Sequence, residues 1–286
     1  MKVKGETTRF SDAHCHLNPV RGLGVRAGEK FKKVGGWFIV VVSLPPWYYG
    51  ISVGDVKAYR KCFDLMVSVC RELKGIGLKS ALHLGFHPAE VDRYSRLGLR
   101  PERIKKLGFQ VIDLAAKYIE EGLAQGFGEV GRQHYPTSKL NVEIAVSIMK
   151  YALIKATDLR APVHLHLEQG GEKTIDWIER VVKSEGIDRR LLILHHIDPL
   201  SLGCAIERGF WTTILGTKEN LKIVAKNPPR YLVESDFLDD PKRPGAVIVP
   251  WSVPRAWRQV IESGFCNEQY VREVNVANPC RIYGFE

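Results

Sequence analysis

All nine histidines of the 286-residue chain lie between positions 14 and 196, and most of them end a short apolar run. The densest group is the segment Asp12-Ala13-His14-Cys15-His16 near the N-terminus. Side chains alternate across a β-strand, so His14 and His16 share one face while Cys15 points away from them. Imidazole is the commonest metal ligand in proteins. We therefore predict that His14 and His16 hold a metal ion at the end of a first strand.

Other segments carry side chains of the same chemistry. Glu129 stands among the glycines of segment 126–131, where a carboxylate can bridge two cations. His164 and His166 share a face of segment 162–166, and His166 is nearer its carboxyl end. The remaining candidates lie in two short segments: His195 and His196 end segment 191–196, and Asp236 ends the segment Glu234-Ser235-Asp236. Such a set of imidazoles and carboxylates suits zinc, manganese, nickel or iron, and suits magnesium less well.

Some of the histidines have a plainer interpretation, as buried core residues that are hydrogen-bonded and bind no metal. His83 lies four residues before His87 and is interpreted as a core residue or as a support for the site. We expect His164 to pack one layer below the metal and to donate a hydrogen bond to a ligand. His134 follows the 126–131 segment, where it could touch a substrate.

These residues must be positioned by a regular alternation of strands and helices. Apolar residues at helical spacing fill the stretches between the strands. Eight alternations predict a (β/α)8 barrel of α/β class, formed as one domain over residues 1–286. A doubly wound open sheet is the alternative, but barrels collect residues from every strand end on one face. The expected strands are Arg9–His16, Trp37–Ser43, Ser80–His87, Ala124–Val130, Pro162–His166, Leu191–His196, Phe210–Leu215 and Tyr231–Ser235, and the expected helices are Val53–Leu73, Ile104–Glu121, Glu143–Thr157, Thr174–Ser184, Lys218–Ala225, Val253–Ser263 and Glu268–Asn275.

Composition narrows the partners and the compartment. The net charge of +10 favours a polyanion such as nucleic acid, although the basic residues are spread along the chain. The N-terminal MKVKGETTRF has no apolar region of a signal peptide, and the apolar run Trp37–Leu44 is too short to span a bilayer. Six cysteines form no CxxC pair, which indicates reduced thiols. We expect a cytoplasmic protein that is not embedded in a membrane.

With these motifs in place, the chain resembles the TatD family of metal-dependent deoxyribonucleases in the amidohydrolase-like superfamily. The likeness is strongest to the family's archaeal branch of predicted metal-dependent hydrolases. It runs from DAHCH through GFHP (85–88), GEVG (128–131) and PVHLH (162–166) to ESD. The resemblance implies two divalent metal ions and places His87 toward a substrate phosphate. The residues it assigns to the metals are His14, His16, Glu129 as the bridge, His166, Asp236, and either His195 or His196.

The resemblance leaves that last choice open and shows two departures from the family pattern. The spacing to Gly209-Phe210 favours His196, whereas the commoner aliphatic-His-Cys pattern favours His195, and we prefer His196. The family usually continues GExG with Leu-Asp or Leu-Glu, but Arg132-Gln133 follows here. Where the family usually has an Arg two residues after His166, this chain has Glu168. The ligands are therefore expected to transfer more safely than the substrate.

The predicted function is metal-dependent hydrolysis by a metal-bridging hydroxide. The favoured reaction is phosphodiester hydrolysis of the kind that a deoxyribonuclease or exonuclease catalyses. Asp236 would accept a proton, Glu129 would bridge the metals, and His87 would stabilise charge on the substrate. Single-stranded DNA or a small molecule is the expected partner. One alternative is an amidohydrolase acting on a small amide, lactone or cyclic amide. The other is a non-catalytic binding protein on the same barrel, which intact ligand positions disfavour.

Overall fold

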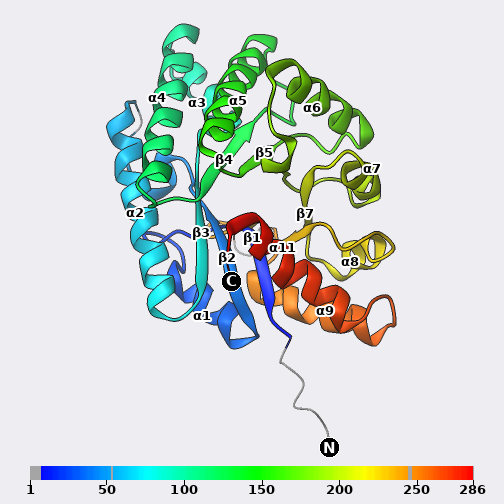
Figure 1. The fold of residues 1–286 in the computed structure, drawn as a ribbon. Coiled ribbons are helices and arrows are strands. Elements are labelled where there is room, and N and C mark those ends of the chain that lie inside the picture. The colour runs from blue at the N-terminus through cyan, green and yellow to red at the C-terminus, as the bar shows by residue number, and fades with distance from the viewer. Residues whose placement is uncertain (1–7, 53, 244–246, 286) are drawn as a thin grey trace, which may run out of the picture.

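The parallel β-strands of the chain curve into a barrel, and helices cover its outer surface (Figure 1). The computed structural model describes residues 8–52, 54–243 and 247–285, and all elements named below belong to those residues. The strands follow the order β8-β7-β6-β5-β4-β3-β2-β1-β9. Their bounds are β1 (Phe10–His16), β2 (Gly36–Val42), β3 (Lys79–Leu84), β4 (Gly126–Gly131), β5 (Val163–His166), β6 (Leu192–Leu194), β7 (Trp211–Leu215), β8 (Leu232–Glu234) and β9 (Phe237–Leu238).

The eighth strand of the barrel is divided in two. Its first part, β8, pairs with β7, and its second part, β9, pairs with β1 through Cys15 and Phe237. Ser235 and Asp236 separate the two parts, and Asp236 has a φ of 48°, a left-handed conformation that is uncommon outside glycine. The strand thereby connects β7 to β1. The prediction of a (β/α)8 barrel in one α/β domain is confirmed, with the correction that the eighth strand is split.

The helices that connect the strands lie outside the sheet, and α9, α10 and α11 follow the last strand (Figure 1). A π-helical turn, η5 (Glu273–Ala277), joins the last two of them. The α-helices of the described chain are α1 (Val25–Lys33), α2 (Val56–Gly75), α3 (Pro88–Arg96), α4 (Pro101–Glu120), α5 (Lys139–Leu159), α6 (Glu172–Glu185), α7 (Leu202–Glu207), α8 (Lys218–Val224), α9 (Val253–Glu262), α10 (Glu268–Arg272) and α11 (Asn278–Tyr283).

Side-chain caps explain where two of the helices begin. The Asp55 side chain accepts a hydrogen bond from the Ala58 N–H and starts α2, three residues after the expected start at Val53, which lies outside the described residues. Helix α3 begins at His87, whose ring accepts from the Ala89 N–H. The expected third strand, Ser80–His87, was too long, because β3 ends at Leu84. Its last residues lead into α3, which the sequence analysis did not predict.

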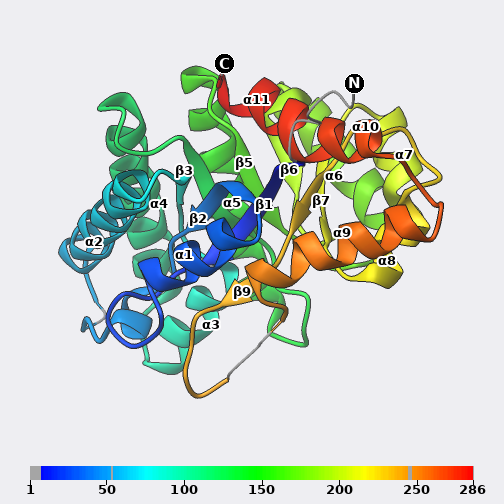
Figure 2. The same cartoon turned by 90° about the horizontal axis from the view of Figure 1, so that it is seen from below.

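The two ends of the barrel differ in what fills them. Phe38, Val40 and Val42 on β2 point to the interior, where Tyr283 and Phe285 from the C-terminal segment pack against them. Helix α11 lies across this end in the view along the barrel (Figure 1). Figure 2 shows β9 and α3 at the opposite end (Figure 2). The end that carries the carboxyl termini of the strands therefore remains for polar side chains.

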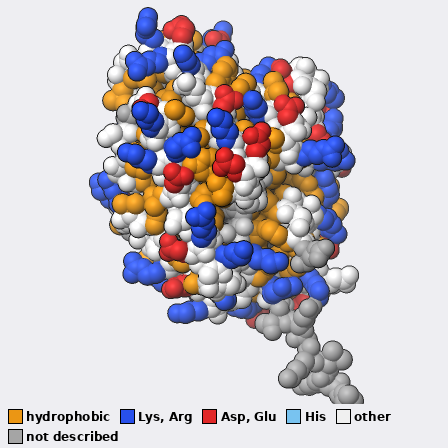
Figure 3. Space-filling view, turned by 60° about the vertical axis from the view of Figure 1, so that its left-hand side comes forward, with side chains coloured by type: hydrophobic (Ala, Val, Ile, Leu, Met, Phe, Trp, Pro, Cys, Tyr) orange, Lys and Arg blue, Asp and Glu red, His pale blue; other side chains and the backbone are white. Residues whose placement is uncertain are grey.

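The outer surface carries charges of both signs. On the face seen in Figure 3, basic side chains lie among acidic and apolar ones instead of forming one continuous patch (Figure 3). None of the helices in the described part of the chain combines the length and hydrophobicity that crossing a membrane requires. The excess of basic residues is thus distributed on this face, as their spread along the sequence predicts.

Candidate metal centre

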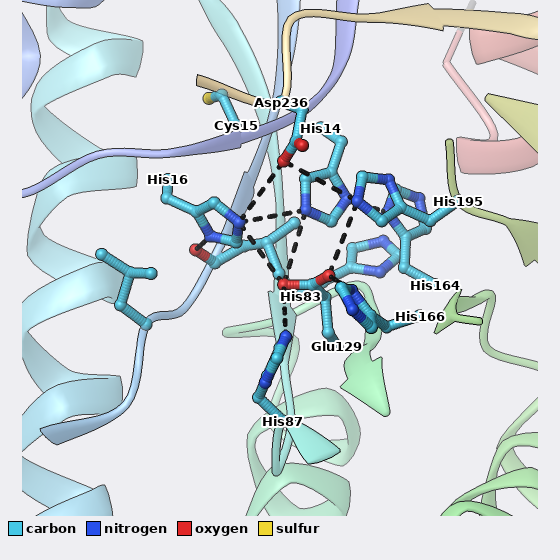
Figure 4. A network of polar contacts seen from close by, with 12 residues as sticks. His14, Cys15, His16, His83, His87, Glu129, His164, His166, His195 and Asp236 are labelled. Carbon is cyan, nitrogen blue, oxygen red and sulfur yellow. Dashed lines mark hydrogen bonds and ion pairs between the residues drawn. The ribbon is translucent and has the colours of Figure 1, made fainter. Parts of the chain in front are cut away.

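Histidines and carboxylates from five parts of the barrel meet at the carboxyl ends of the strands (Figure 4). β1 contributes two of them, and β4 and β5 contribute one each. The others come from the residues that follow β6 and from the break between β8 and β9. Three of their groups have ligand atoms within 4.8 Å of one another: His14, His16 and Asp236; His14, Glu129 and His195; and His166, His195 and His196.

The carboxylate of Glu129 lies between two sets of imidazoles. Its Oε2 atom is 3.4 Å from His16 Nε2 and 3.8 Å from His14 Nε2. Its Oε1 atom is 2.7 Å from His166 Nδ1 and 3.6 Å from His195 Nε2. Each oxygen thus faces its own pair of nitrogens, which is the arrangement of a carboxylate that bridges two cations.

Asp236 faces both sets. Its Oδ1 atom is 3.9 Å from His16 Nε2 and 3.7 Å from His195 Nε2. Its backbone N–H donates to the carbonyl oxygen of His14, which holds the left-handed residue against β1. The division of the eighth strand therefore turns this carboxylate toward the cluster.

The hydrogen-bond partners of the ring nitrogens indicate where each neutral ring carries its proton, and therefore whether a cation fits here. His16 Nδ1 donates to the Val42 carbonyl oxygen at 3.0 Å, which leaves Nε2 of the neutral ring as a lone pair. His195 Nδ1 donates to Glu234 Oε2 at 2.7 Å with the same result. Both lone pairs face oxygens of the Glu129 carboxylate, at 3.4 Å from His16 and 3.6 Å from His195, and two acceptors cannot form a hydrogen bond. Acceptors that face one another in a buried space fit a bound cation.

His166 supports the same conclusion. Its Nδ1 atom approaches Glu129, while its Nε2 atom is buried and has no hydrogen-bond partner among the described residues. A buried polar atom without a partner is costly and calls for a ligand or an ion. The nearby glycine explains how the ring reaches its place, since a Cβ on Gly131 would lie 1.9 Å from the His166 carbonyl oxygen. Only glycine lets β4 and β5 approach so closely there.

His195 occupies the position that we expected His196 to take. The strand ends at Leu194, so both histidines follow it and the alternation expected over Leu191–His196 does not apply. His195 is buried beside both carboxylates, whereas His196 is partly exposed and has a φ of 40°. The His196 ring lies 5.1 Å from the His166 ring, at the rim. The geometry places His195 nearer both carboxylates, while His196 keeps a ligand nitrogen within 4.8 Å of those of His166 and His195, so the preference for His196 stays a prediction.

His87 contributes a donor instead of a lone pair. Its Nδ1 accepts from the Ala89 N–H at 3.0 Å, so the proton of the neutral ring is on Nε2. That Nε2 atom points into the cluster, 3.9 Å from Glu129 Oε2. Burial lowers the pKa of His87 to about 3, which keeps the ring neutral at pH 7. His87 is placed to donate to an oxygen bound between the two sets of ligands.

Asp12 has a different role from the one its position in the DAHCH segment suggests. It shares a strand face with His14 and His16, but its carboxylate accepts from the Ser235 N–H at 2.8 Å and from the Ser235 hydroxyl at 2.5 Å. Burial raises the pKa of Asp12 to about 7, against the effect of these hydrogen bonds. Asp12 thus holds the residue next to Asp236, and the only sequence signal for this was its place in the motif.

The two carboxylates of the cluster titrate in opposite directions. Burial opposes ionisation of Glu129, but the imidazoles of His166, His87 and His14 hold its pKa well below the usual range. Burial, together with the charges of Glu129 and Asp12, raises the pKa of Asp236 well above its usual range. Burial also lowers the pKa of His16 to about 4. The cluster therefore combines an ionised bridge, a basic carboxylate and, at His16 and His87, imidazoles whose pKa values are lowered.

A cavity of about 720 Å³ opens beside the cluster and shares Asp236 and His196 with it. His134, Glu168 and Asn220 also line this cavity. Glu168 is paired with Arg132 through two hydrogen bonds, one of them 2.7 Å from Arg132 Nε to Glu168 Oε2.

The pairing changes how the departure at position 168 is interpreted. Arg132 also stacks on Trp177, with the guanidinium carbon 3.7 Å from the ring centroid. Burial raises the pKa of Glu168, but the hydrogen bonds from Arg132 and Thr174 lower it further, so the pKa lies below its usual range. The anion that replaces the family's usual Arg is therefore neutralised by a cation from the neighbouring strand end.

A parallel barrel with histidines and carboxylates at the carboxyl ends of its strands is the arrangement expected of a metal-dependent hydrolase. The family model for TatD-related DNases matches residues 11–284, and the chain belongs to that family. It is 28% identical over 279 residues to an uncharacterised protein of Methanocaldococcus jannaschii, with 96% of each chain covered.

Solved structures share the fold. A TatD homologue from Escherichia coli K12 superposes with a TM-score of 0.68 at 15% identity, covering 98% of this chain and 99% of that one. An organophosphorus hydrolase from Deinococcus radiodurans superposes with a TM-score of 0.62 at 13% identity, covering 97% and 93%. At these identities the two structures show the barrel, and the residues of this chain must supply the argument about its chemistry.

Proposed function

We propose that the protein hydrolyses its substrate with two divalent metal ions, one on each side of Glu129. His14, His16 and Asp236 would hold the first ion, and His166 and His195 the second. The observation that carries this proposal is the division of the Glu129 carboxylate, with one oxygen facing each set of nitrogens. His196 lies at the rim and would contact the substrate instead of the second ion.

The ions, when bound, lower the pKa of water enough to supply a nucleophile at neutral pH. Asp236 faces both sets of ligands, and its raised pKa suits it to accept the proton that the nucleophile releases. His87 carries its proton on the nitrogen that points into the cluster, so it can donate to the charge that develops on the substrate. Asp12 keeps the carboxylate of Asp236 in place through Ser235.

A phosphodiester is the substrate class that we favour. The family description as TatD-related DNases and the net charge of +10 both support it. Single-stranded DNA is the partner that we expect. We also propose a cytoplasmic location, in keeping with six cysteines that are all unpaired.

One observation favours a second candidate, a small uncharged ester, lactone or amide. Among the described residues that line the 720 Å³ cavity there is no Lys or Arg. A pocket for a nucleotide backbone usually presents cations to the phosphates, whereas the polar lining here consists of amides, imidazoles and carboxylates. The organophosphorus hydrolase with the same barrel acts, by its name, on organophosphorus compounds.

Activity assays with and without metal test the proposal. Protein stripped of metal with a chelator should hydrolyse neither a phosphodiester nor a lactone. Added Zn²⁺ or Mn²⁺ should restore hydrolysis of the substrate class that the untreated protein hydrolyses. No hydrolysis of either substrate class with any added metal would overturn the proposed function.

Binding at several salt concentrations then separates the two substrate classes. Binding of single-stranded DNA should weaken with salt by roughly 0.7 in log–log slope for each phosphate neutralised. DNA binding that is absent or flat with salt, together with turnover of the lactone, would favour the second candidate.

A further inference from the structure

A chain of buried polar groups runs from the metal cluster to the C-terminal helix. His14 Nδ1 lies 2.8 Å from His164 Nδ1. His164 Nε2 lies 3.5 Å from the Tyr283 hydroxyl, which is 3.1 Å from His83 Nε2. His83 Nδ1 in turn lies 3.1 Å from the Phe127 carbonyl oxygen. Strands β1, β5, β3 and β4 are thus connected through one hydroxyl of α11.

The positions of the protons follow from one end of this chain. A carbonyl oxygen only accepts, so His83 Nδ1 carries a proton and its Nε2 is an acceptor. The Tyr283 hydroxyl must then donate to His83, and its oxygen accepts from His164 Nε2. This makes Nδ1 of neutral His164 an acceptor, so the proton of His14 is on Nδ1. The nitrogen of His14 that faces Glu129 is therefore left as a lone pair, as a metal ligand requires.

Packing keeps the chain in this arrangement. His14, His83 and His164 are fully buried, and the His14 and His164 rings are nearly parallel, with centroids 5.1 Å apart. The Tyr283 ring packs on Phe38 at 5.2 Å and closes the end of the barrel opposite the cluster. Figure 4 shows His83 and His164 grouped beside the ligand residues (Figure 4). No carboxylate takes part in the four contacts that link His14, His164, Tyr283, His83 and the Phe127 carbonyl oxygen.

We propose that Tyr283 and His83 are positioning residues that act through His164 to keep the metal-facing nitrogen of His14 free of a proton. The inference rests on the proposed metal site and extends it to the last helix of the chain. Without the Tyr283 hydroxyl, His164 has no partner that favours a proton on Nε2. The opposite tautomer, which puts the proton of His14 on the nitrogen facing Glu129, then becomes accessible and competes with the metal.

The test compares two Tyr→Phe variants in the same C-terminal segment. Tyr283→Phe removes the hydroxyl of the chain, while Tyr270→Phe removes one that binds the backbone oxygens of Val224 and Asn227 and touches no histidine. Zn²⁺ affinity is measured by chelator competition, and the ring nitrogens of the metal-free protein are observed by ¹⁵N NMR. Changing an outer partner of a metal ligand typically costs about 10–100-fold in metal affinity.

We expect Tyr283→Phe to weaken Zn²⁺ binding about tenfold and to give His14 a mixture of tautomers, and Tyr270→Phe to leave both unchanged. Equal affinities and an unchanged His14 spectrum in the two variants would overturn the inference. The NMR measurement needs no metal. If the wild-type protein binds no Zn²⁺, the proposed function fails, and the proton on His14 still decides whether the chain of hydrogen bonds acts as we infer.

Discussion

Two layers of histidines share the interior of this barrel. The histidines of one layer lie beside carboxylates, and those of the other do not. In the upper layer, His16, His166 and His195 lie within 4 Å of carboxylate oxygens of Glu129 or Asp236. In the lower layer, His83 contacts the Tyr283 hydroxyl and the Phe127 carbonyl oxygen, and His164 contacts the same hydroxyl and His14. The same residue type thus forms a candidate site for cations in one layer and a hydrogen-bond network in the other.

The difference shows that the neighbours of an imidazole decide its role. A lone pair that faces anions in a buried space needs a cation, whereas an imidazole that both donates and accepts needs nothing further. His14 belongs to both layers, since one nitrogen faces Glu129 and the other faces His164. The comparison predicts that changes in the upper layer act directly on metal binding and turnover. Changes in the lower layer should act on stability and, through His14, on metal affinity.

Removing the charge of the bridge should have the largest effect. Glu129→Gln keeps the size of the side chain but weakens both metal positions, so we expect kcat/KM to fall roughly 10³-fold, or about 4 kcal/mol. Steady-state hydrolysis by the metal-loaded protein measures this. Glu185→Gln, which removes a surface carboxylate paired with Lys150, is the matched control. A Glu129→Gln protein as active as this control would remove Glu129 from the site.

Substitutions of the adjacent residues His195 and His196 should have smaller effects, and the two effects should differ from each other. We expect His195→Ala to lower Zn²⁺ affinity about 100-fold, because it deletes a buried lone pair and leaves Glu234 without its partner. His196→Ala should change the affinity less than about fivefold, since its ring lies at the rim. Metal titrations of the two variants decide the matter, and the reverse order would restore the assignment based on spacing.

Acid should destabilise the metal-free protein through the lower layer. Burial lowers the pKa of folded His83 to about 3, while the unfolded value is about 6.5. Below pH 6.5 the unfolded chain therefore binds a proton that the folded chain does not, and the free energy of unfolding falls as the pH falls toward 3. Between pH 7 and pH 5, His83 alone should cost about 2 kcal/mol.

Urea denaturation at these two pH values measures the effect. His83→Phe, whatever its own stability, should show a pH dependence that is smaller by that amount. An identical pH dependence in the wild-type and His83→Phe proteins would show that His83 is not held neutral by the fold.

The smallest effect is expected at the ion pair that borders the cavity. Arg132 and Glu168 are partly exposed, so their coupling should contribute only about 1 kcal/mol to the free energy of unfolding. A double-mutant cycle with Arg132→Met and Glu168→Gln gives this value. Coupling of zero would mean that the pair is not formed in solution and that Glu168 presents a free charge to the cavity.

The sequence predicted the barrel well because its signals are local. Helical spacing and short β-rich runs placed all eight strands within a few residues, and β1 with His14 and His16 followed from alternation alone. The break in the eighth strand could not be predicted. It depends on the left-handed Asp236 and on contacts of residues 235 and 236 with β1, more than 200 positions away.

The details of the site that the sequence left open have the same origin. The choice between His195 and His196 required knowing that β6 stops at Leu194, which neighbouring strands determine. Tyr283 carried no signal at all, because its partner His164 is 119 residues away and the helix that carries it closes the far end of the barrel. The pairing of Arg132 with Glu168 was also hidden, although each had been noticed as a departure from the family pattern.

Counting the ions bound per chain tests the central claim most directly. Metal-free protein is titrated with Zn²⁺, and the bound metal is measured after removal of the excess. The account predicts two ions per chain in the wild-type protein, and one in a His166→Ala variant that keeps His14, His16 and Asp236. A wild-type chain that binds no ion would contradict it, and so would a His166→Ala chain that still binds two.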